Sequence, residues 1–244
     1  MRAVEVAWVS ILWMAARSAP GQSLDPLTVD PGHYHLDLEN RWVRVIREHM
    51  APREAMPMHQ HPAPGAVIVF LTDRHNRLTS PDGQSRELRD HAGDLMWSDA
   101  STHRSENLSD AYFEAVQIEQ RVSAGGKGFV PAPAEPTDAT VVDPKHYHVE
   151  LENEYVRVLR VTIGPHEKLS LHKHPNTAAV LVHLTDQHLR LTEADGRAHE
   201  SNYAAGQIHW APAGQAHQDE NLNDTPLRFI RVELKKAVGV SGDE

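Results

Sequence analysis

From about residue 30 onward, short apolar segments alternate with turn-forming residues. The segments are rich in β-branched and aromatic residues and are bounded by Pro, Gly, Asp and Asn, a pattern typical of β-strands. We predict strands at Trp42–Arg47, Ala66–Leu71, Asp94–Trp97, Tyr112–Ile118, Val156–Thr162, Ala178–Thr185, His209–Ala211 and Leu227–Leu234. Pro81-Asp82-Gly83 predicts a hairpin turn. Many short strands without a long helical period predict an all-β fold of the antiparallel barrel or jelly-roll type.

The second half of the chain repeats the first half. Asp30–Arg47 and Asp143–Arg160 are identical at 12 of 18 positions, at an offset of 113 residues. The offset becomes 114 between His103 and His217, so the first copy is one residue shorter before that histidine. An internal duplication on this scale predicts two tandem domains, at residues 30–120 and 143–235.

The segments outside the two repeats have a different composition. Residues 121–142 concentrate Gly and Pro without an apolar period, which predicts a linker. At the N-terminus, Arg2 precedes an apolar run and then small residues, and this order predicts a signal peptide over residues 1–21. The protein is then exported to the periplasm or secreted; the alternative is a cytoplasmic protein that keeps an amphipathic N-terminal helix.

Composition excludes several partners and chemistries. The formal net charge is −10 and no basic patch is visible, which argues against a nucleic acid or an anionic membrane surface as the partner. The chain contains no cysteine, so disulfides, thiolate metal ligands and cysteine nucleophiles are ruled out. The remaining expectation is a small-molecule substrate, and homo-oligomerisation stays open.

Histidines form the strongest chemical signal. Because alternate residues of a strand point the same way, His172 and His174 can present two imidazoles to one metal ion, with His217 as a third. With 18 histidines in the chain, a single His-x-His triplet carries little weight. The first repeat contains the same arrangement, however, in His59, His61 and His103.

These residues resemble the cupin superfamily, and the duplication resembles a two-domain bicupin. The second cupin motif, Gly-x5-Pro-x-Gly-x2-His-x3-Asn, is complete from Gly206 to Asn221, with Pro212 and Gly214 in the turn before His217. The first motif is matched only in its histidine pair. Its metal-binding Glu would fall near Gly65 or Ala66 and near Ala178 or Ala179, and neither repeat has a carboxylate there.

The resemblance implies a cupin barrel that binds a divalent metal ion through three histidines, without another cofactor. Imidazole ligands suit Fe, Mn, Zn, Ni and Cu, so the sequence does not choose among these metals. Three neutral ligands leave the charge of the ion uncompensated, which favours an anionic substrate. The best-matching activity is a metal-dependent dioxygenase, that is, a non-haem oxidoreductase. The alternatives are an isomerase, lyase or decarboxylase, a non-catalytic ligand-binding cupin, and a structural protein without metal.

Two further histidines and one asymmetry complete the sequence-based picture. A lyase or isomerase would need an acid–base residue in the barrel, and His183 and His209 are the candidates, although core packing is the favoured interpretation of both. We interpret the repeated His33/His35 and His146/His148 pairs as structural. Because the first repeat has Asp99 and Ser101 where the second has Pro212 and Gly214, we predict that the second barrel carries the activity.

Overall fold

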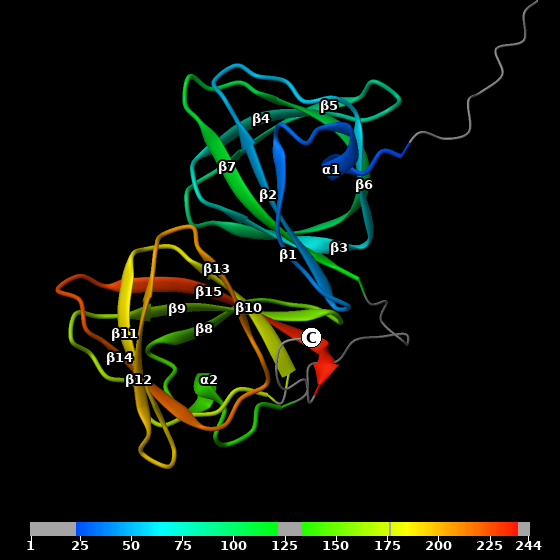
Figure 1. Cartoon of the computed structure of the whole chain (residues 1–244). Helices are drawn as coiled ribbons and strands as arrows, with labels where there is room; N and C mark the ends of the chain where they lie inside the picture. Colours follow the sequence, from blue (N-terminus) through cyan, green and yellow to red (C-terminus); the bar gives the residue numbers. More distant parts are fainter. Residues whose placement is uncertain (1–22, 122–132, 176, 239–244) are drawn as a thin grey trace, which may run out of the picture.

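The computed structural model describes residues 23–121, 133–175 and 177–238. The predicted signal peptide and most of the Gly-rich part of the predicted linker lie outside these residues. The described chain folds into two β-barrels, drawn in blue to green and in green to red in Figure 1, and contains two four-residue helices. The predicted all-β fold with tandem jelly-roll domains is therefore confirmed.

The first barrel is built from a single antiparallel sheet. Its strands are β1 (Tyr34–Glu39), β2 (Val43–Met50), β3 (His59–Phe70), β4 (Arg74–Thr79), β5 (Ser85–Asp90), β6 (Leu95–Asn107) and β7 (Phe113–Gln120). They pair in the order β1-β2-β7-β3-β6-β4-β5. The predicted hairpin turn joins β4 to β5, and Gly83 there has a φ of +86°, a conformation that glycine adopts without strain.

The second barrel repeats this order with one interruption. Its strands are β8 (Tyr147–Glu152), β9 (Val156–Ile163), β10 (Thr177–His183), β11 (Gln187–Glu193), β12 (Ala198–Tyr203), β13 (Ile208–Ala211), β14 (His217–Asn221) and β15 (Leu227–Val238). The sheets run β13-β10-β15-β9-β8 and β12-β11-β14. Together β13 and β14 replace the continuous β6, because Pro212 lacks an N–H and ends strand pairing at Ala211. The proline turn thus splits one wall of the second barrel.

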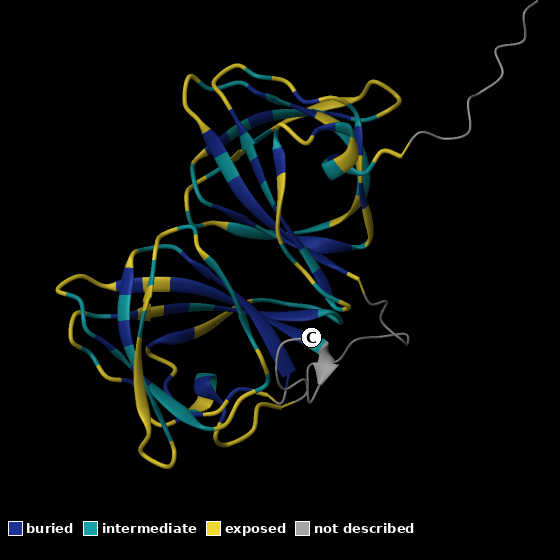
Figure 2. Cartoon of the chain, viewed as in Figure 1, coloured by how far each residue is buried: buried dark blue, intermediate teal, exposed yellow. Residues whose placement is uncertain are grey.

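A buried apolar cluster joins the two barrels. It contains Val43, Val45, Val67, Val69, Val116 and Ile118 of the first barrel and Val156, Val158, Ala178, Val180, Val182, Ile230, Val232 and Leu234 of the second. Strand β10 is buried along its whole length, since Val180 and Val182 belong to this cluster while Leu181 packs inside the second barrel. Figure 2 shows buried strands where the barrels meet. Burying each such side chain stabilises the pair by roughly 1.5–3 kcal/mol, so the barrels form one unit.

Polar contacts across the interface are reciprocal, as duplication predicts. Arg47 donates to the carbonyl of Gly206 at 2.7 Å, and Arg160, its counterpart, donates to the carbonyl of Gly93 at 2.6 Å. Trp97 of β6 also stacks on Tyr155 with the ring centroids 5.3 Å apart. The barrels therefore face each other with equivalent surfaces, related by an approximate twofold axis.

Each barrel is preceded by a short helix that packs against it. Helix α1 (Pro26–Val29) and helix α2 (Ala139–Val142) are each capped by an aspartate side chain, Asp25 and Asp138. Asp138 also pairs with Arg157 of β9 at 2.8 Å. Helix α2 lies within the range predicted as linker, yet Ala139 is fully buried against the second barrel.

Candidate metal centres

The structure brings all six predicted metal ligands together in two groups. His59, His61 and His103 form one group, and His172, His174 and His217 form the other. Within each group, one ring nitrogen per histidine lies within 4.8 Å of the others. Neutral imidazoles at this separation fit a single divalent metal ion.

Strand pairing explains how the third histidine reaches the other two. In the first barrel His59 and His103 are direct partners in the β3–β6 register. In the second, an isolated bridge pairs His172 with His217, through backbone hydrogen bonds of 2.9 Å in both directions. His172 and His174 lie just before β10, not on a regular strand as predicted. The bridge between His172 and His217 and the proline turn therefore hold the three histidines together.

Hydrogen bonds at Nδ1 orient the rings. Nδ1 of His59, His172 and His217 donates to the carbonyls of Pro57, Ser170 and Gln215 at 2.9, 2.8 and 3.1 Å. Nδ1 of His61 and His174 donates to the carboxylates of Glu119 and Glu233 at 3.1 and 3.0 Å. Because Nδ1 carries the proton in this tautomer, the Nε2 lone pair is left to bind the metal.

The carboxylate behind each histidine pair belongs to a buried ion-pair chain. Glu233 accepts from Arg157 at 2.6 Å, and Arg157 continues to Asp138. Burial alone would raise the pKa of Glu233, but the hydrogen bond from His174 and the charge of Arg231 hold it well below its usual range. Glu119 accepts from Arg44 at 2.7 Å in the first barrel. Each site therefore has a buried carboxylate, paired with an arginine, that fixes one metal-binding imidazole.

Burial favours the neutral form of four of the metal-binding histidines. Desolvation, with the neighbouring histidines, lowers the pKa of His59 to about 4 and that of His103 to about 3. Desolvation also lowers the pKa of His172 and, well below its usual value, that of His174. Neutral imidazoles are the metal-binding form, so these four histidines need no deprotonation step near neutral pH.

At Gly65, one of the two positions near which the Glu of the first cupin motif would fall in the first barrel, there is no room for a side chain. Gly65 has a φ of +136°, and a Cβ there would lie 2.4 Å from the carbonyl oxygen of Ser98. Carboxylates from other strands lie close by instead. Glu48 of β2 lines the same cavity as His61, and in the second barrel Asp219 of β14 lies 3.8 Å from Nε2 of His217.

A tyrosine at each metal site was not found from the sequence. The hydroxyls of Tyr34 and Tyr147 lie 3.0 Å from Nε2 of His59 and His172, respectively. Both belong to the repeated His-Tyr-His element, which we interpreted as packing. The flanking His33 and His146 do have structural roles, since they bind Asp30 and Asp143 at 2.7 and 2.5 Å. The sequence did contain a signal for this role, because the tyrosine recurs at the same position in both repeats.

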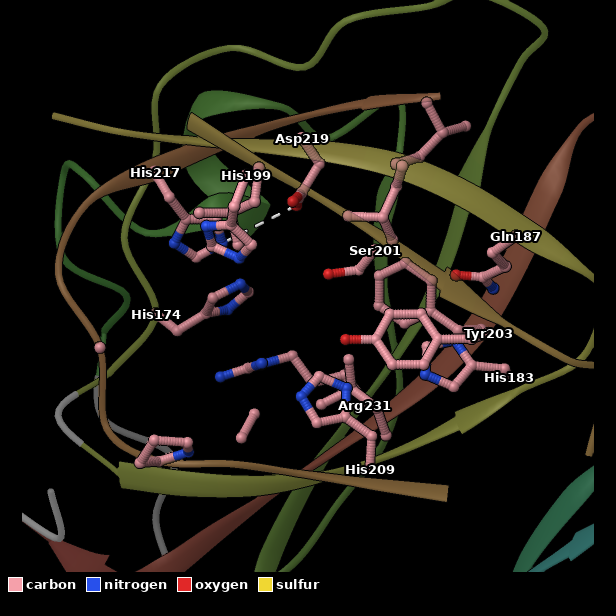
Figure 3. Close-up of a pocket in the computed structure, with 18 of the residues that line it drawn as sticks. His174, His183, Gln187, His199, Ser201, Tyr203, His209, His217, Asp219 and Arg231 are labelled. Carbon is pink, nitrogen blue, oxygen red and sulfur yellow. Dashed lines mark ion pairs between the residues drawn. The ribbon is translucent and has the colours of Figure 1, made fainter. Parts of the chain in front are cut away.

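The space beside the metal site is large in the second barrel. A cavity of about 400 Å³ extends from His174 and His217 past Arg231 to His183 and Tyr203. Pro212 and Gly214 also line it, so the break between β13 and β14 forms part of its wall. Figure 3 shows His174 and His217 at one end of this cavity and His183 and Gln187 at the other, with Arg231 and His209 between them.

The equivalent space in the first barrel is almost filled. Its cavity is about 50 Å³, enough for an ion and a few waters but not for an organic substrate. Arg74 lies over the ring of Phe70, 4.3 Å from its centroid, and donates to Asp90 at 2.6 Å. Glu48 accepts from Gln117 at 2.6 Å inside this space.

The structure places His183 and His209, the acid–base candidates, in the wall of the larger cavity and outside the metal-binding group. Their rings are nearly parallel to that of Tyr203, with centroids 4.1 and 4.9 Å from it. Burial lowers the pKa of His183 to about 4. The amide of Gln187 opposes this shift but is not in hydrogen-bonding geometry. Burial and then the charge of Arg231 lower the pKa of His209.

Comparison with known proteins identifies the fold. The chain matches no protein-family model. It is 33% identical over 73 residues to oxalate decarboxylase OxdC of Bacillus subtilis (strain 168), a match that spans 30% of this chain and 19% of that protein. Among solved structures, AerE from Microcystis aeruginosa has a TM-score of 0.58 at 16% identity, covering 84% of this chain and 94% of its own.

Two further solved structures extend the likeness. A cupin 2 conserved barrel domain protein from Leptotrichia buccalis has a TM-score of 0.50 at 11% identity, over 83% of this chain and 88% of its own. Oxalate decarboxylase of Bacillus subtilis, described with Mn(II) centres, has a TM-score of 0.51 at 16% identity, over 86% of this chain and 77% of its own. The chain thus has the cupin fold twice, and its architecture is that of a bicupin, as its motifs predict. None of the described helices has the length and apolar character needed to cross a membrane.

Proposed function

We propose that this protein is a metal-dependent lyase that decarboxylates a small carboxylate substrate in the second barrel. The observation that carries the proposal is Arg231, a guanidinium with 7% relative exposure that faces the cavity beside the metal-binding histidines. A buried cation next to a divalent metal site favours an anionic ligand.

The geometry of Arg231 suits a carboxylate. Its Nε donates to Glu233 at 3.2 Å, and its two terminal nitrogens make no hydrogen bond to any other described residue. A guanidinium in this state offers a planar pair of donors that matches the two oxygens of a carboxylate. Because Arg231 lines the same cavity as His174 and His217, the bound carboxylate or a neighbouring oxygen of the substrate would face the metal site.

Decarboxylation breaks the bond between the carboxylate carbon and its neighbour, leaves the electron pair on that neighbour, and requires a proton there. A divalent ion held by His172, His174 and His217 would polarise the substrate oxygens. The residues of the chain bind the carboxylate through Arg231 and exclude water with the apolar wall of the cavity. Asp219, Tyr203 and His209 are among the groups in this wall that can supply the proton.

Likeness to oxalate decarboxylase supports this reaction over the dioxygenase expected from the sequence, although it establishes only the fold. The dioxygenase remains the second candidate, because three imidazoles leave coordination positions on the ion for substrate and O₂. Manganese is our first choice of metal, since the solved decarboxylase has Mn(II) centres.

The test is a panel of small carboxylates, including oxalate, malonate and 2-oxo acids, supplied to metal-loaded protein. CO₂ release and O₂ consumption are measured together. We expect CO₂ release without stoichiometric O₂ consumption, and its loss in Arg231→Gln. Consumption of one O₂ per substrate, with both oxygen atoms incorporated into the product and no hydrogen peroxide released, would instead establish the dioxygenase. Unaltered turnover in Arg231→Gln would contradict the substrate assignment.

We also propose that residues 1–21 are removed on export and that the mature protein acts outside the cytoplasm. This proposal rests on the sequence alone. N-terminal sequencing of the native protein would support it by finding a start after Ser18, Ala19 or Gly21, and would contradict it by finding an intact Met1.

A further inference from the structure

We propose that a tyrosine oxygen is the fourth protein ligand at each metal site, from Tyr34 in the first barrel and from Tyr147 in the second. Each ion is then held by three imidazole nitrogens and one phenolate oxygen. The phenolate takes the place of the carboxylate that the first cupin motif would supply. Coordination by tyrosine is independent of the reaction that the protein catalyses.

Each tyrosine hydroxyl lies beside a metal-binding atom. The hydroxyl oxygens of Tyr34 and Tyr147 are 3.0 Å from Nε2 of His59 and His172, respectively. Nε2 is the metal-binding nitrogen of both histidines, because their Nδ1 atoms donate to backbone carbonyls. Two donor atoms that are each about 2.1 Å from one ion, at a right angle, lie about 3.0 Å apart. The hydroxyl oxygens are therefore placed as neighbouring ligands of an octahedral ion would be.

A hydrogen bond from the hydroxyl to Nε2 has the same length, but it cannot persist once metal binds. In the metal-free site the hydroxyl donates its proton to the lone pair of Nε2, and the ion requires this lone pair. The hydroxyl of Tyr34 makes no other hydrogen bond to the described residues. Loss of its acceptor would leave a buried polar group unpaired, which costs about 1–3 kcal/mol. Coordination avoids this penalty, since it places the oxygen on the ion and releases the proton.

Burial and ring packing fix both tyrosines in this position. Tyr34 begins β1 and Tyr147 begins β8, and each has a relative exposure of 2%. The ring of Tyr147 packs against both rings of its histidine pair, with centroids 4.9 and 5.7 Å away. The ring of Tyr34 does the same, at 5.2 and 6.2 Å. This placement is shared by two barrels whose cavities differ in volume, which indicates a role toward the metal and not toward a substrate.

No described carboxylate occupies the position of a fourth ligand. Within each group of three histidines the ligand atoms lie within 4.8 Å of one another, and no described Asp or Glu joins either group. Ligands on opposite sides of one ion are only about 4.2 Å apart, so Glu48 and Asp219 are not placed to bind it directly. The tyrosines therefore supply the anionic oxygen that both sites otherwise lack.

A phenolate ligand changes what each site can hold. Three neutral imidazoles leave the double charge of the ion uncompensated in a buried site, and one phenolate removes half of it. In the second barrel an octahedral ion with four protein ligands keeps two positions for an anionic substrate, and Arg231 lines the cavity beside them.

Visible absorption of metal-loaded protein tests the coordination. A phenolate bound to Fe(III) or Cu(II) gives an intense visible charge-transfer band, which imidazole ligands alone do not give. Metal-free protein is loaded with either ion, and the metal bound per chain is measured. We expect a band from each loaded barrel, with tyrosinate ring vibrations enhanced in resonance Raman spectra excited within it. Absence of the band from protein that has bound both ions would overturn the proposal.

Phenylalanine variants assign the band to its residues. Tyr34→Phe should remove the contribution of the first barrel, Tyr147→Phe that of the second, and the double variant should have no band. The exposed control Tyr112→Phe should keep the whole band. Because Phe removes only the hydroxyl, the variants should fold, which circular dichroism checks. A band that survives in the double variant would contradict coordination by these two residues.

Metal affinity separates coordination from hydrogen bonding. Competition with a chelator should show that Tyr34→Phe and Tyr147→Phe each weaken metal binding at their own site by about tenfold or more. If the variants lost affinity while the unaltered protein had no band, the hydroxyl would only donate a hydrogen bond to another ligand of the ion. That result would overturn the proposal.

Discussion

The two barrels derive from one duplicated sequence, yet they differ in the space next to the metal site. Both keep three histidines, a carboxylate behind one of them, and a tyrosine beside another. The cavity is about 50 Å³ in the first barrel and about 400 Å³ in the second. The metal-binding frame was thus retained twice, and the residues that would touch a substrate diverged.

The charge of the two cavities differs as well as their volume. Glu48 and Gln117 lie inside the first barrel, where the second has Val161 and Arg231. Each cavity has a buried carboxylate near its metal site, Glu48 in the first and Asp219 in the second, and in the second barrel Arg231 adds a positive charge beside the site. The first barrel is therefore suited to hold an ion without substrate, and the second to hold an ion with an anionic substrate.

Removing the third histidine should produce the largest difference between the barrels. His217→Ala should lower turnover by at least about a hundredfold with the fold intact, because the ion loses a ligand beside the substrate. His103→Ala should leave most of the activity. Turnover of the best carboxylate is compared in metal-quantified samples that have matching circular dichroism spectra. Greater damage from His103→Ala would place the activity in the first barrel.

Exchanging the residues at the Arg231 position tests the charge difference. Arg231→Gln should weaken carboxylate binding by about 10- to 100-fold, through loss of charge-assisted hydrogen bonds. The reverse change, Gln117→Arg, should create no binding, since the first cavity is too small and Glu48 would pair with the new guanidinium. Calorimetry on both variants checks this expectation, and carboxylate binding gained by Gln117→Arg would contradict it.

Acid should destabilise the second barrel through His183. Burial lowers its folded-state pKa from 6.5 to about 4, so the unfolded chain takes up the proton first as the pH falls. Above pH 6.5 the neutral His183 leaves the free energy of unfolding unaffected by pH. Between about pH 6.5 and 4 the free energy of unfolding falls, by about 3 kcal/mol in total.

Urea unfolding of metal-free protein at several pH values measures the acid effect. His183→Phe should lose less stability than the unaltered protein over this range, because Phe does not titrate. Identical pH dependence of the two proteins would contradict the assignment. Phe70→Leu serves as the control for a core change in the first barrel that involves no titrating group.

Cleavage between the barrels should have the smallest effect. The Gly- and Pro-rich composition predicts that a protease cuts between Ser123 and Asp138. Because a shared apolar cluster joins the barrels, both fragments should elute together from a sizing column and keep their metal. Separation of the fragments would show that the interface is weak, and a first cut inside either barrel would contradict the predicted linker.

The features that could be predicted from the sequence were those repeated between its halves. Short segments rich in β-branched and aromatic residues identified eight of the fifteen strands of the described chain, and recurrence of His59, His61 and His103 as His172, His174 and His217 identified the metal ligands. What differs between the halves was harder to interpret. Arg231 replaces Gln117 on a strand whose register is visible only once the sheet is formed, so its position in the cavity gave no sequence signal.

Tertiary packing explains why other features of the structure could not be predicted from the sequence. Tyr147 lies 25 residues before His172 in sequence, and only the pairing of β8 with β9 brings its hydroxyl to the imidazole. The interface between the barrels was also not predicted. Val180 and Leu181 are both apolar, and the sequence does not tell which of them faces the barrel interior and which the partner barrel.

The central claim is that substrate binds only in the second barrel. Two variants test it directly, one with His59 and His61 changed to Ala and one with His172 and His174 changed to Ala, each loaded with Mn(II) and assayed for about one metal per chain. Malonate is titrated into both by calorimetry. We predict one malonate bound per chain, with the affinity of the unaltered protein, in the variant that keeps the second site, and none in the variant that keeps the first. Binding in the second variant, or equal binding in both, would contradict the account.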